Sequence, residues 1–458
     1  MPLILPGNVG SATAATGYDV ANSCRFNPAD SAFVHKTPDA GDRQKATFSC
    51  WIKRSLIASA QTVFWAGSDN SNYQAVVRFL SNDKIVVAEI NSGSTTWEIF
   101  TDRVFKDISA WYHIVVAMDT TQATAANRVK IYVNGVQETS LNIDGGYPAE
   151  DRNTLINTAV PHQIAHDYVA QYYGGYVAEA CFIEGSQNAP TDFGEFDEDS
   201  GIWKPIDVSG LTFGTNGFYL DFEASGNLGN DANGGTDLTE SGLAATDQST
   251  DTCTNNFATM NPLSSGMTLT EGNLNVANSG GKNAVSTFSV ASGKWYVEMK
   301  ATNAQTYNPI VGIATDNSTA VTNPASTDYP GNFAESHGYD RTGTITSSNA
   351  TDQGSLTTSQ SDNDIIGLAV DLDSGTKTAQ WYVNGSSVGS AVTLVSDESY
   401  VFMTYSSGSQ SGTGAWNFGS PSYANSSSVA DGNGFGNFEY APPSGYFALC
   451  TKNLAEYG

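Results

Sequence analysis

Closely spaced acidic side chains in one segment of this chain could do acid–base chemistry. The string Glu195-Phe-Asp-Glu-Asp199 alternates, so Glu195, Asp197 and Asp199 would share one face of a strand. Hydrolysis of a glycosidic bond with retention needs two carboxylates about 5 Å apart on such a face. The string lies among Gly, Pro and Thr, however, and not within an apolar strand. An exposed acidic loop explains it more simply, so we assign no catalytic residue.

The histidines give little support for nucleophilic or metal chemistry. One Gly-x-Ser-x-Gly string occurs, Gly385-Ser-Ser-Val-Gly389, but it begins at an Asn-Gly pair typical of a hairpin, so nothing in the sequence indicates a serine nucleophile at a strand–helix turn. His113 falls in an apolar run beside Trp111, which predicts a packed, hydrogen-bonded histidine. His162 and His166 are candidates for an exposed loop, but no third metal ligand accompanies them.

One Asx-rich string spaces oxygen atoms like a calcium loop. It is Asp231-Ala-Asn-Gly-Gly-Thr-Asp237, whose candidate ligands are Asp231, Asn233 and Asp237. Calcium needs only oxygen ligands, but this string lacks the terminal bidentate Glu of a calcium loop. Turns rich in Asx produce such strings by chance. Calcium is therefore the one cofactor that the sequence leaves open.

Aromatic residues in segments between strands are candidates for ligand binding. Tyrosine offers rigid apolar area and a hydroxyl, which suits stacking on sugar rings or anchoring a protein epitope. Each of these residues could equally pack in a core or between domains. The candidate binding residues are Tyr168, Tyr172 and Tyr173 in the first half, and Tyr307, Tyr329, Tyr339 and Arg341 in the second half.

The composition favours strands and tight turns, and the charge argues against two kinds of partner. The 458 residues include 45 Gly, 21 Tyr and 21 Phe, and only 15% are charged, which is typical of β-proteins. The 47 acidic residues exceed the 20 basic ones and give a formal charge of −27. Such a surface repels phosphate backbones and anionic lipid headgroups. We therefore expect neither a nucleic acid nor a membrane as the partner.

The cysteines and the N-terminus bear on where the protein folds. Five widely separated cysteines without Cys-x-x-Cys spacing predict small buried thiols, not a zinc site or a disulfide framework. The N-terminal residues lack the basic region and the long apolar run of a signal peptide. We expect the chain to fold in a reducing cytoplasm.

Short alternating apolar runs fill the chain, and no long run has helical periodicity. They predict an all-β fold of two tandem antiparallel β-sandwiches. Asn134-Gly135 and Asn384-Gly385 each lie between apolar runs and predict type I′ hairpins. The expected organisation is an N-terminal segment (1–22), a first sandwich (23–205), a connector with one closing strand (206–262), a second sandwich (263–420) and a C-terminal tail with a closing strand (421–458).

Four motifs of the first sandwich resemble a laminin G-like domain of the concanavalin A-type jelly-roll class. They are Phe48-Ser-Cys-Trp-Ile-Lys53, Trp111-Tyr-His-Ile-Val-Val-Ala-Met-Asp119, Ile131-Tyr-Val-Asn-Gly135 and Tyr173-Gly-Gly-Tyr-Val-Ala-Glu-Ala-Cys-Phe-Ile183. The resemblance implies binding through rim loops, with calcium as a common rim ion. The class also includes laminarinase-like glycoside hydrolases, but Ser200 replaces the last Glu of their motif.

The second sandwich resembles a SPRY domain. The motifs, in the family's order, are Gly293-Lys-Trp-Tyr-Val-Glu-Met299, Val311-Gly-Ile-Ala314, Gly338-Tyr-Asp340, Asp364-Ile-Ile-Gly-Leu-Ala-Val-Asp-Leu-Asp373, Trp381-Tyr-Val-Asn-Gly385 and Trp416-Asn-Phe-Gly419. SPRY domains bind through loops at one edge of the sandwich, which implies a second binding surface here.

The pairing of these two domains resembles virion proteins of marine tailed bacteriophages. It implies a non-enzymatic structural protein of the virion, in a fibre, the tail or the capsid decoration, assembled in the host cytoplasm. Its expected partners are other virion proteins and a host surface glycan or protein, bound in a lectin-like way. Two alternatives stay open, a decoration or cement protein that contacts only virion subunits and a polysaccharide depolymerase. The sequence also leaves a homo-oligomer open.

Overall fold

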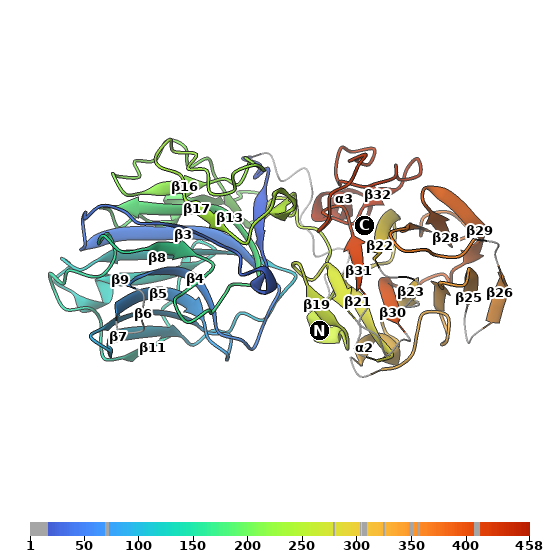
Figure 1. Ribbon diagram of the computed structural model, residues 1–458, viewed down its shortest axis with the longest axis horizontal. Coiled ribbons are helices and arrows are strands. Elements are labelled where there is room, and N and C mark those ends of the chain that lie inside the picture. The colour runs from blue at the N-terminus through green and yellow to red at the C-terminus, as the bar shows by residue number, and fades with distance from the viewer. Residues whose placement is uncertain are drawn as a thin grey trace. The chain divides into compact units, whose positions relative to one another are not determined.

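The computed structural model of the chain describes residues 17–68, 73–277, 280–302, 304, 309–323, 326–347, 351–355, 358–406 and 413–458. Strands dominate these residues, and the described α-helices are α2 (Thr319–Thr322) and α3 (Thr451–Tyr457). The chain divides into two compact units, one ending at Thr254 and the other starting at Asn255 (Figure 1). The predicted fold class of two tandem antiparallel β-sandwiches is confirmed. In the described part of the chain, no helix has the length and apolarity needed to cross a membrane.

Two eight-stranded sheets form the first sandwich, and an apolar core fills the space between them. Its strands are β1 (Ser23–Phe26), β2 (Phe33–Lys36), β3 (Lys45–Arg54), β4 (Gln61–Gly67), β5 (Tyr73–Phe79), β6 (Ile85–Asn91), β7 (Ser94–Thr101), β8 (Trp111–Asp119), β9 (Val129–Val133), β10 (Val136–Gln137), β11 (Leu141–Asp144), β12 (His162–Ile164), β13 (Gly175–Glu184), β16 (Phe218–Leu220), β17 (Thr239–Ser241) and β18 (Gln248–Ser249). One sheet has the order β10-β9-β8-β3-β13-β1-β18, with β16 also paired to β13. The other has the order β11-β7-β6-β5-β4-β12-β2-β17.

The second sandwich has an eight-stranded and a six-stranded sheet around its own core. Its strands are β19 (Thr268–Thr270), β20 (Asn275–Ala277), β21 (Lys282–Val290), β22 (Lys294–Ala301), β23 (Pro309–Thr315), β24 (Ser336–Tyr339), β25 (Thr344–Ser347), β26 (Thr351–Ser355), β27 (Ile365–Asp371), β28 (Thr378–Val383), β29 (Ser386–Thr393), β30 (Tyr400–Ser406), β31 (Thr413–Asn417) and β32 (Phe447–Ala448). The sheet orders are β19-β20-β31-β22-β27-β28-β29, with β32 paired to β22, and β21-β30-β23-β24-β25-β26.

The two sandwiches share one topology. The order β10-β9-β8-β3-β13-β1 of the first unit reappears as β29-β28-β27-β22-β31-β20 in the second. Likewise, β7-β6-β5-β4-β12-β2 reappears as β26-β25-β24-β23-β30-β21. Strands β20 to β29 therefore correspond in sequence order to β1 to β10, and β30 and β31 correspond to β12 and β13. This correspondence allows the two units to be compared position by position.

The Asn-Gly turns lie at equivalent places in the two units. Asn134 and Gly135 have φ values of 48° and 78°, and Asn384 and Gly385 have 49° and 77°. Positive φ at both central residues is the type I′ geometry, so both predicted hairpins are confirmed, β9–β10 and β28–β29. The amide oxygen of Asn134 accepts from the backbone N–H of His113 at 2.7 Å, and that of Asn384 accepts from Ile365 at 3.0 Å. Each asparagine therefore also ties its turn to the neighbouring strand.

In each unit, short strands that follow the shared set of strands along the chain pair with strands of the same sandwich. Strands β16, β17 and β18 lie within the predicted connector 206–262, yet all three pair with strands of the first sandwich. The structure thus divides the chain at residues 254 and 255, inside that connector. In the C-terminal tail, β32 pairs in parallel with β22, in the segment where a closing strand was expected.

Candidate functional site

The loop between β12 and β13, residues 165–173, combines a fixed backbone with exposed apolar side chains. Ala165 and Ala170 have φ values of 74° and 61°, which alanine adopts only when its surroundings impose them. The N–H of Ala165 donates to the carbonyl of Val63 at 3.0 Å, and the N–H of Thr62 donates to the carbonyl of Gln171 at 3.0 Å. Strand β4 therefore holds the loop at both ends.

The carboxylate of Asp167 organises the centre of this loop. The residue is fully buried. Its Oδ1 accepts from the N–H groups of Val169 and Gln171 at 3.0 Å each, and its Oδ2 accepts from the hydroxyl of Thr62 at 2.9 Å. Three bonds to one buried carboxylate leave the loop little freedom. As a result, Tyr168 and Val169 project from it 52% and 49% exposed.

Aromatic rings from β2 and from this loop lie side by side in what we call the aromatic row, Phe33, His35, His166 and Tyr172. The ring of His166 stacks on Tyr172 at 4.4 Å and on Phe33 at 4.5 Å between centroids, and Phe33 lies 5.5 Å from His35. All four are partly exposed. Burial lowers the pKa of His166, so the ring is held neutral over more of the pH range.

The tautomer of His166 follows from its hydrogen bond. Nδ1 lies 2.6 Å from Oε1 of Gln163, an acceptor, so Nδ1 carries the proton and donates. Nε2 is then an acceptor for a ligand hydroxyl in the neutral ring. The aromatic row with Tyr168 thus offers stacking faces, hydroxyls and one ring acceptor, which are the groups that bind sugars and peptide epitopes.

The structure separates the predicted binding tyrosines into surface and interior residues. Tyr168 is exposed and Tyr172 belongs to the aromatic row, whereas Tyr173 is buried and donates to the carbonyl of Lys53 at 3.0 Å. Tyr339 is likewise buried and donates to the carbonyl of Thr358 at 2.8 Å. The structure therefore does not support a ligand contact for either Tyr173 or Tyr339.

The remaining binding candidates of the second sandwich do not form one surface in the described residues. Tyr329 is partly buried, with its ring centroid 5.5 Å from that of Tyr405. Arg341 is partly buried, and its carbonyl accepts from the N–H of Gln360 at 3.0 Å. Tyr307 lies outside the described residues.

The calcium candidates form a turn that is largely satisfied by the protein itself. Oδ1 of Asp231 accepts from the N–H groups of Tyr219 and Asn233. The two oxygens of Asp237 accept from the N–H of Asp231 and from the side chain of Asn227. Asp231 and Asp237 both act electrostatically on Lys36, opposing the lowering of its pKa by burial. No group of three or more His, Cys, Asp or Glu suited to a metal occurs in the described part of the chain.

The acidic string 195–199 forms the tip of a small hairpin, β14 (Gly194–Phe196) and β15 (Trp203–Pro205). Glu195 is exposed and pairs with Lys204 at 3.3 Å. Oδ1 of Asp197 accepts from the N–H groups of Asp199 and Ser200 within its own turn. Asp199 is exposed. Asp197 thus holds the turn, and it shares Lys204 with Glu195, so these two carboxylates are paired with a cation and are not arranged as a free acid and nucleophile for retaining hydrolysis.

Two histidines are packed inside the first sandwich. His162 lies on β12, not in an exposed loop as expected, and is 2% exposed. His113 is 1% exposed and stacks on Trp51, with ring centroids 4.8 Å apart. Nδ1 of His113 accepts from Nε1 of Trp203 at 3.0 Å, because indole is only a donor. Nε2 therefore carries the proton toward Ser49, 2.8 Å away, so the predicted packed, hydrogen-bonded role is confirmed.

Replacing His113 with Gln should reduce the pH dependence of stability. Burial lowers the pKa of His113 from 6.5 to about 3. Between these two values the imidazole is protonated in the unfolded chain and neutral in the folded chain. Below pH 6.5 the native state therefore loses stability as the pH falls, by about 2 kcal/mol at about pH 5. His113→Gln lacks this loss. The difference in the free energy of unfolding between the natural protein and the variant, measured with urea, should therefore shrink as the pH falls from about 7 to about 5. A difference that stays constant over this pH range would contradict the lowered pKa of His113.

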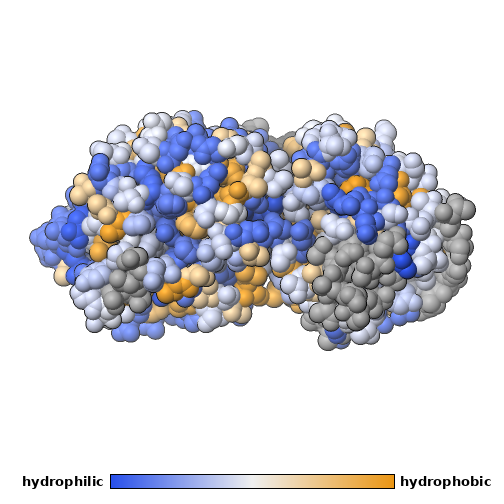
Figure 2. All heavy atoms as spheres, in the orientation of Figure 1, coloured by the Kyte–Doolittle hydropathy of each residue, from blue (hydrophilic) through white to orange (hydrophobic). Residues whose placement is uncertain are grey.

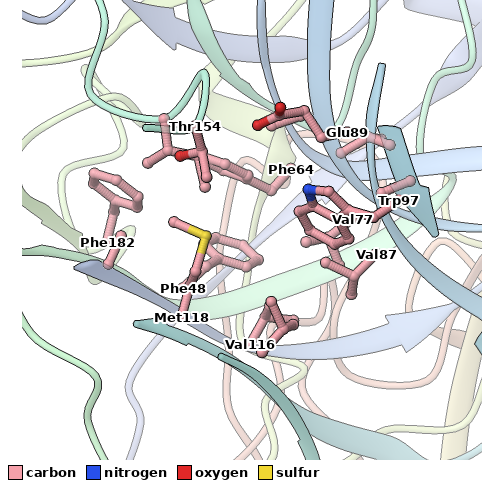
Figure 3. Close-up of a pocket in the computed structure, with 16 residues that line it drawn as sticks. Phe48, Phe64, Val77, Val87, Glu89, Trp97, Val116, Met118, Thr154 and Phe182 are labelled. Carbon is pink, nitrogen blue, oxygen red and sulfur yellow. The ribbon is translucent and has the colours of Figure 1, made fainter. Parts of the chain in front are cut away.

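A cavity of about 30 Å³ lies between the two sheets of the first sandwich. Figure 3 shows its apolar lining, including Phe48, Val87, Trp97 and Met118. Its one carboxylate, Glu89, accepts from Arg152 at 2.9 Å and from the N–H of Leu155 at 3.1 Å. A space of this size holds one or two waters and no sugar or cofactor. The surface of this sandwich is mainly hydrophilic on the face in Figure 2, with separate apolar patches.

The first sandwich matches a known family by sequence. Residues 29–182 match the model of the concanavalin A-like lectin/glucanases superfamily. The chain contains a concanavalin A-like domain. This domain spans β2 to most of β13 and includes the aromatic row and the loop 165–173. No curated protein sequence is significantly similar to the chain.

Solved structures with related folds are similar to parts of the chain. A human SPRY domain is 14% identical, with a TM-score of 0.25 over 31% of this chain and 90% of that domain. Domains LG4–5 of the mouse laminin alpha1 chain are 10% identical, with a TM-score of 0.30 over 88% of this chain and 86% of theirs. A Bacteroides ovatus protein with a proposed carbohydrate-binding role is 14% identical, with a TM-score of 0.30 over 49% and 58% of the two chains. At these scores the likenesses carry no argument about ligands.

Proposed function

We propose that this protein is a non-enzymatic binding protein that recognises a surface glycan or protein of a host cell through its concanavalin A-like domain. The carrying observation is the loop 165–173, which a buried carboxylate holds in place while Tyr168 and Val169 stay exposed. A rigid loop presenting aromatic area avoids the entropy cost of ordering on binding. The aromatic row beside it adds stacking faces and an acceptor nitrogen.

The wider setting of the proposal is a bacteriophage virion, assembled in the host cytoplasm and including other virion proteins as partners. This setting rests on the resemblance of the two-domain sequence. The strong negative charge is compatible with it, because it favours solubility at high copy number and disfavours binding to nucleic acid. A capsid-decoration protein that contacts only virion subunits is the alternative within the same class.

Binding of the full chain to a glycan array and to intact host cells tests the proposal. Tyr168→Ser should lower the affinity about tenfold or more, as expected for a central aromatic contact. Tyr73→Ser is the matched control, since Tyr73 is also an exposed tyrosine of the same sandwich. It should bind as the natural protein does.

Three outcomes would overturn the proposal. Reducing sugar released from host polysaccharide would make the protein a depolymerase. Binding to empty capsids with no binding to host cells or glycans would make it a decoration protein. Host binding with equal loss in Tyr168→Ser and Tyr73→Ser would remove the loop from the site.

A further inference from the structure

Residues 17–22 cross the outer face of the first sandwich before β1 begins, and we call this segment the strap. Along their strands, Trp51 and Tyr176 alternate with residues of the core, so their side chains point away from it. Val20 is 4% exposed and packs in the apolar cluster that these two aromatic residues form with their neighbours. The strap is therefore anchored on the outside of the sheet by the burial of an apolar side chain.

Two groups of polar contacts also hold the strap. The N–H of Val20 donates to the hydroxyl of Thr254 at 3.1 Å. The hydroxyl of Tyr18 donates to Oε2 of Glu179 at 3.3 Å, and the hydroxyl of Tyr219 donates to the same oxygen at 2.7 Å. The two hydroxyls are 3.2 Å apart. One oxygen of Glu179 thus joins the strap to the sandwich.

The backbone conformation of Glu179 is unusual for a residue inside a strand. Glu179 lies at a β-bulge in β13, where the register with β3 shifts between Ala178 and Cys181. Its φ is 49°, a value that a residue with a side chain adopts only when its surroundings impose it. Bulges redirect a side chain and are common at functional positions. Here the bulge leaves the glutamate 5% exposed, against Tyr18 and Tyr219.

The environment of Glu179 favours the neutral carboxyl group. Burial raises the pKa of Glu179 from 4.5 to about 7, although the hydrogen bonds from Tyr219 and Tyr18 oppose the rise. The charges of Asp221 and Glu223 raise the pKa further. Above about pH 7 a buried carboxylate therefore lies close to other acids, which is costly unless water reaches it.

The other titratable side chains that contact or surround this carboxyl group keep their protons while it titrates. Burial raises the pKa of the thiols of Cys181 and Cys253, and the charge of Glu179 raises both further. Burial also raises the pKa of the hydroxyls of Tyr18 and Tyr219. Among these side chains, Glu179 is the one whose charge changes near pH 7.

We propose that Glu179 is a pH-sensitive switch, which keeps the strap on the sandwich while its carboxyl group is protonated and releases the strap when the group ionises. Release admits water to the carboxylate, so its pKa returns toward 4.5. Because the pKa is higher in the closed form than in the released form, a rise in pH favours release. By this linkage, release should be about tenfold more favourable at about pH 8 than at about pH 6. The switch does not depend on the proposed host binding.

Hydrogen exchange of the full chain at about pH 6 and about pH 8 tests the proposal. The measured quantity is the protection factor of the Val20 N–H, which is the exchange rate of the same peptide without structure divided by the rate in the protein. Release of the strap separates this N–H from Thr254, so its protection should fall about tenfold from the lower to the higher pH. Val20 should also be less protected than the central amides of β3, because the strap opens without unfolding of the sandwich.

Substitutions at and beside the switch make the test specific. Glu179→Gln cannot ionise, so the protection of Val20 should be the same at both pH values. Glu223→Gln is the matched control, since it removes an exposed acid that acts on Glu179, and it should keep most of the fall. Tyr18→Phe keeps the ring but loses the hydroxyl, so it should lower the protection of Val20 at about pH 6 by about threefold to tenfold.

Several outcomes would overturn the proposal. One is a protection factor of Val20 in the natural protein that does not fall between the two pH values. Another is a fall that Glu179→Gln retains, because a different group would then cause it. Equal protection of Val20 and of the central amides of β3 would show that the strap opens only when the whole sandwich unfolds.

Discussion

Replacing Asp251 with alanine is expected to destabilise the first sandwich by about 3–5 kcal/mol. Its carboxylate lies 2.7 Å from the ammonium of Lys53, and both side chains are 1% exposed. Oδ1 also accepts from Nε1 of Trp111 at 3.2 Å. Burial already lowers the pKa of Lys53, which the Asp251 charge opposes. Without Asp251, a buried ammonium and a buried indole N–H lose this acceptor.

Urea unfolding of the full chain measures this effect. The transition of the second sandwich serves as an internal reference, because Asp251 belongs to the first unit. The double substitution Lys53→Met with Asp251→Leu removes both charges together and should recover most of the lost stability. A loss below about 1 kcal/mol for Asp251→Ala would show that the pair is not desolvated as described.

Replacing Glu298 with alanine is expected to destabilise the second sandwich by at least about 3 kcal/mol and to loosen its C-terminal tail. The buried carboxylate accepts from the N–H groups of Glu439 and Tyr440 at 2.9 Å each, from the hydroxyl of Tyr296 at 3.2 Å and from the side chain of Asn417 at 3.2 Å. Alanine would leave these four donors without their shared acceptor.

Proteolysis and pH together separate this effect from a general loss of stability. Cleavage within residues 420–450 should speed up in Glu298→Ala and not in the control Glu398→Ala, whose side chain is only partly buried. Burial raises the pKa of Glu298 from 4.5 to about 7. Its folded pKa exceeds the unfolded value, so the natural protein gains stability from this group as the pH falls from about 7 to about 4.5. The difference in unfolding free energy between the natural protein and Glu298→Ala should therefore narrow as the pH rises from about 4.5 to about 7, and a difference that widens over this range would contradict the shift.

The strands that sequence reasoning located best are those with uninterrupted alternation of apolar residues. The motif Phe48–Lys53 lies within β3, and the motif Trp111–Asp119 coincides with β8. None of the sequence motifs covers strand β21 (Lys282–Val290), because Ser286, Thr287 and Ser289 interrupt its apolar pattern. These polar residues are buried in the structure, where the hydroxyl of Ser286 donates to the carbonyl of Phe288 at 2.8 Å. Burial with a hydrogen bond is invisible to hydrophobic patterning.

The candidate site was anticipated only in part. Tyr168 and Tyr172 were named from the sequence, whereas Phe33, His35 and His166 join them through contacts between β2 and the loop 165–173. Pairings between distant segments depend on the closed fold, which a single sequence does not reveal.

The β-class, the two sandwiches and the Asn-Gly hairpins could be predicted from the amino-acid sequence, because strand alternation and positive-φ turns are local properties of a few neighbouring residues. Which side chains are exposed to solvent depends instead on the three-dimensional fold. Tyr172 and Tyr173 are adjacent and chemically identical, yet one lies in the aromatic row and the other is buried under Lys53. Their roles differ because strand register and loop anchoring, set by residues far along the chain, turn one ring outward and the next inward.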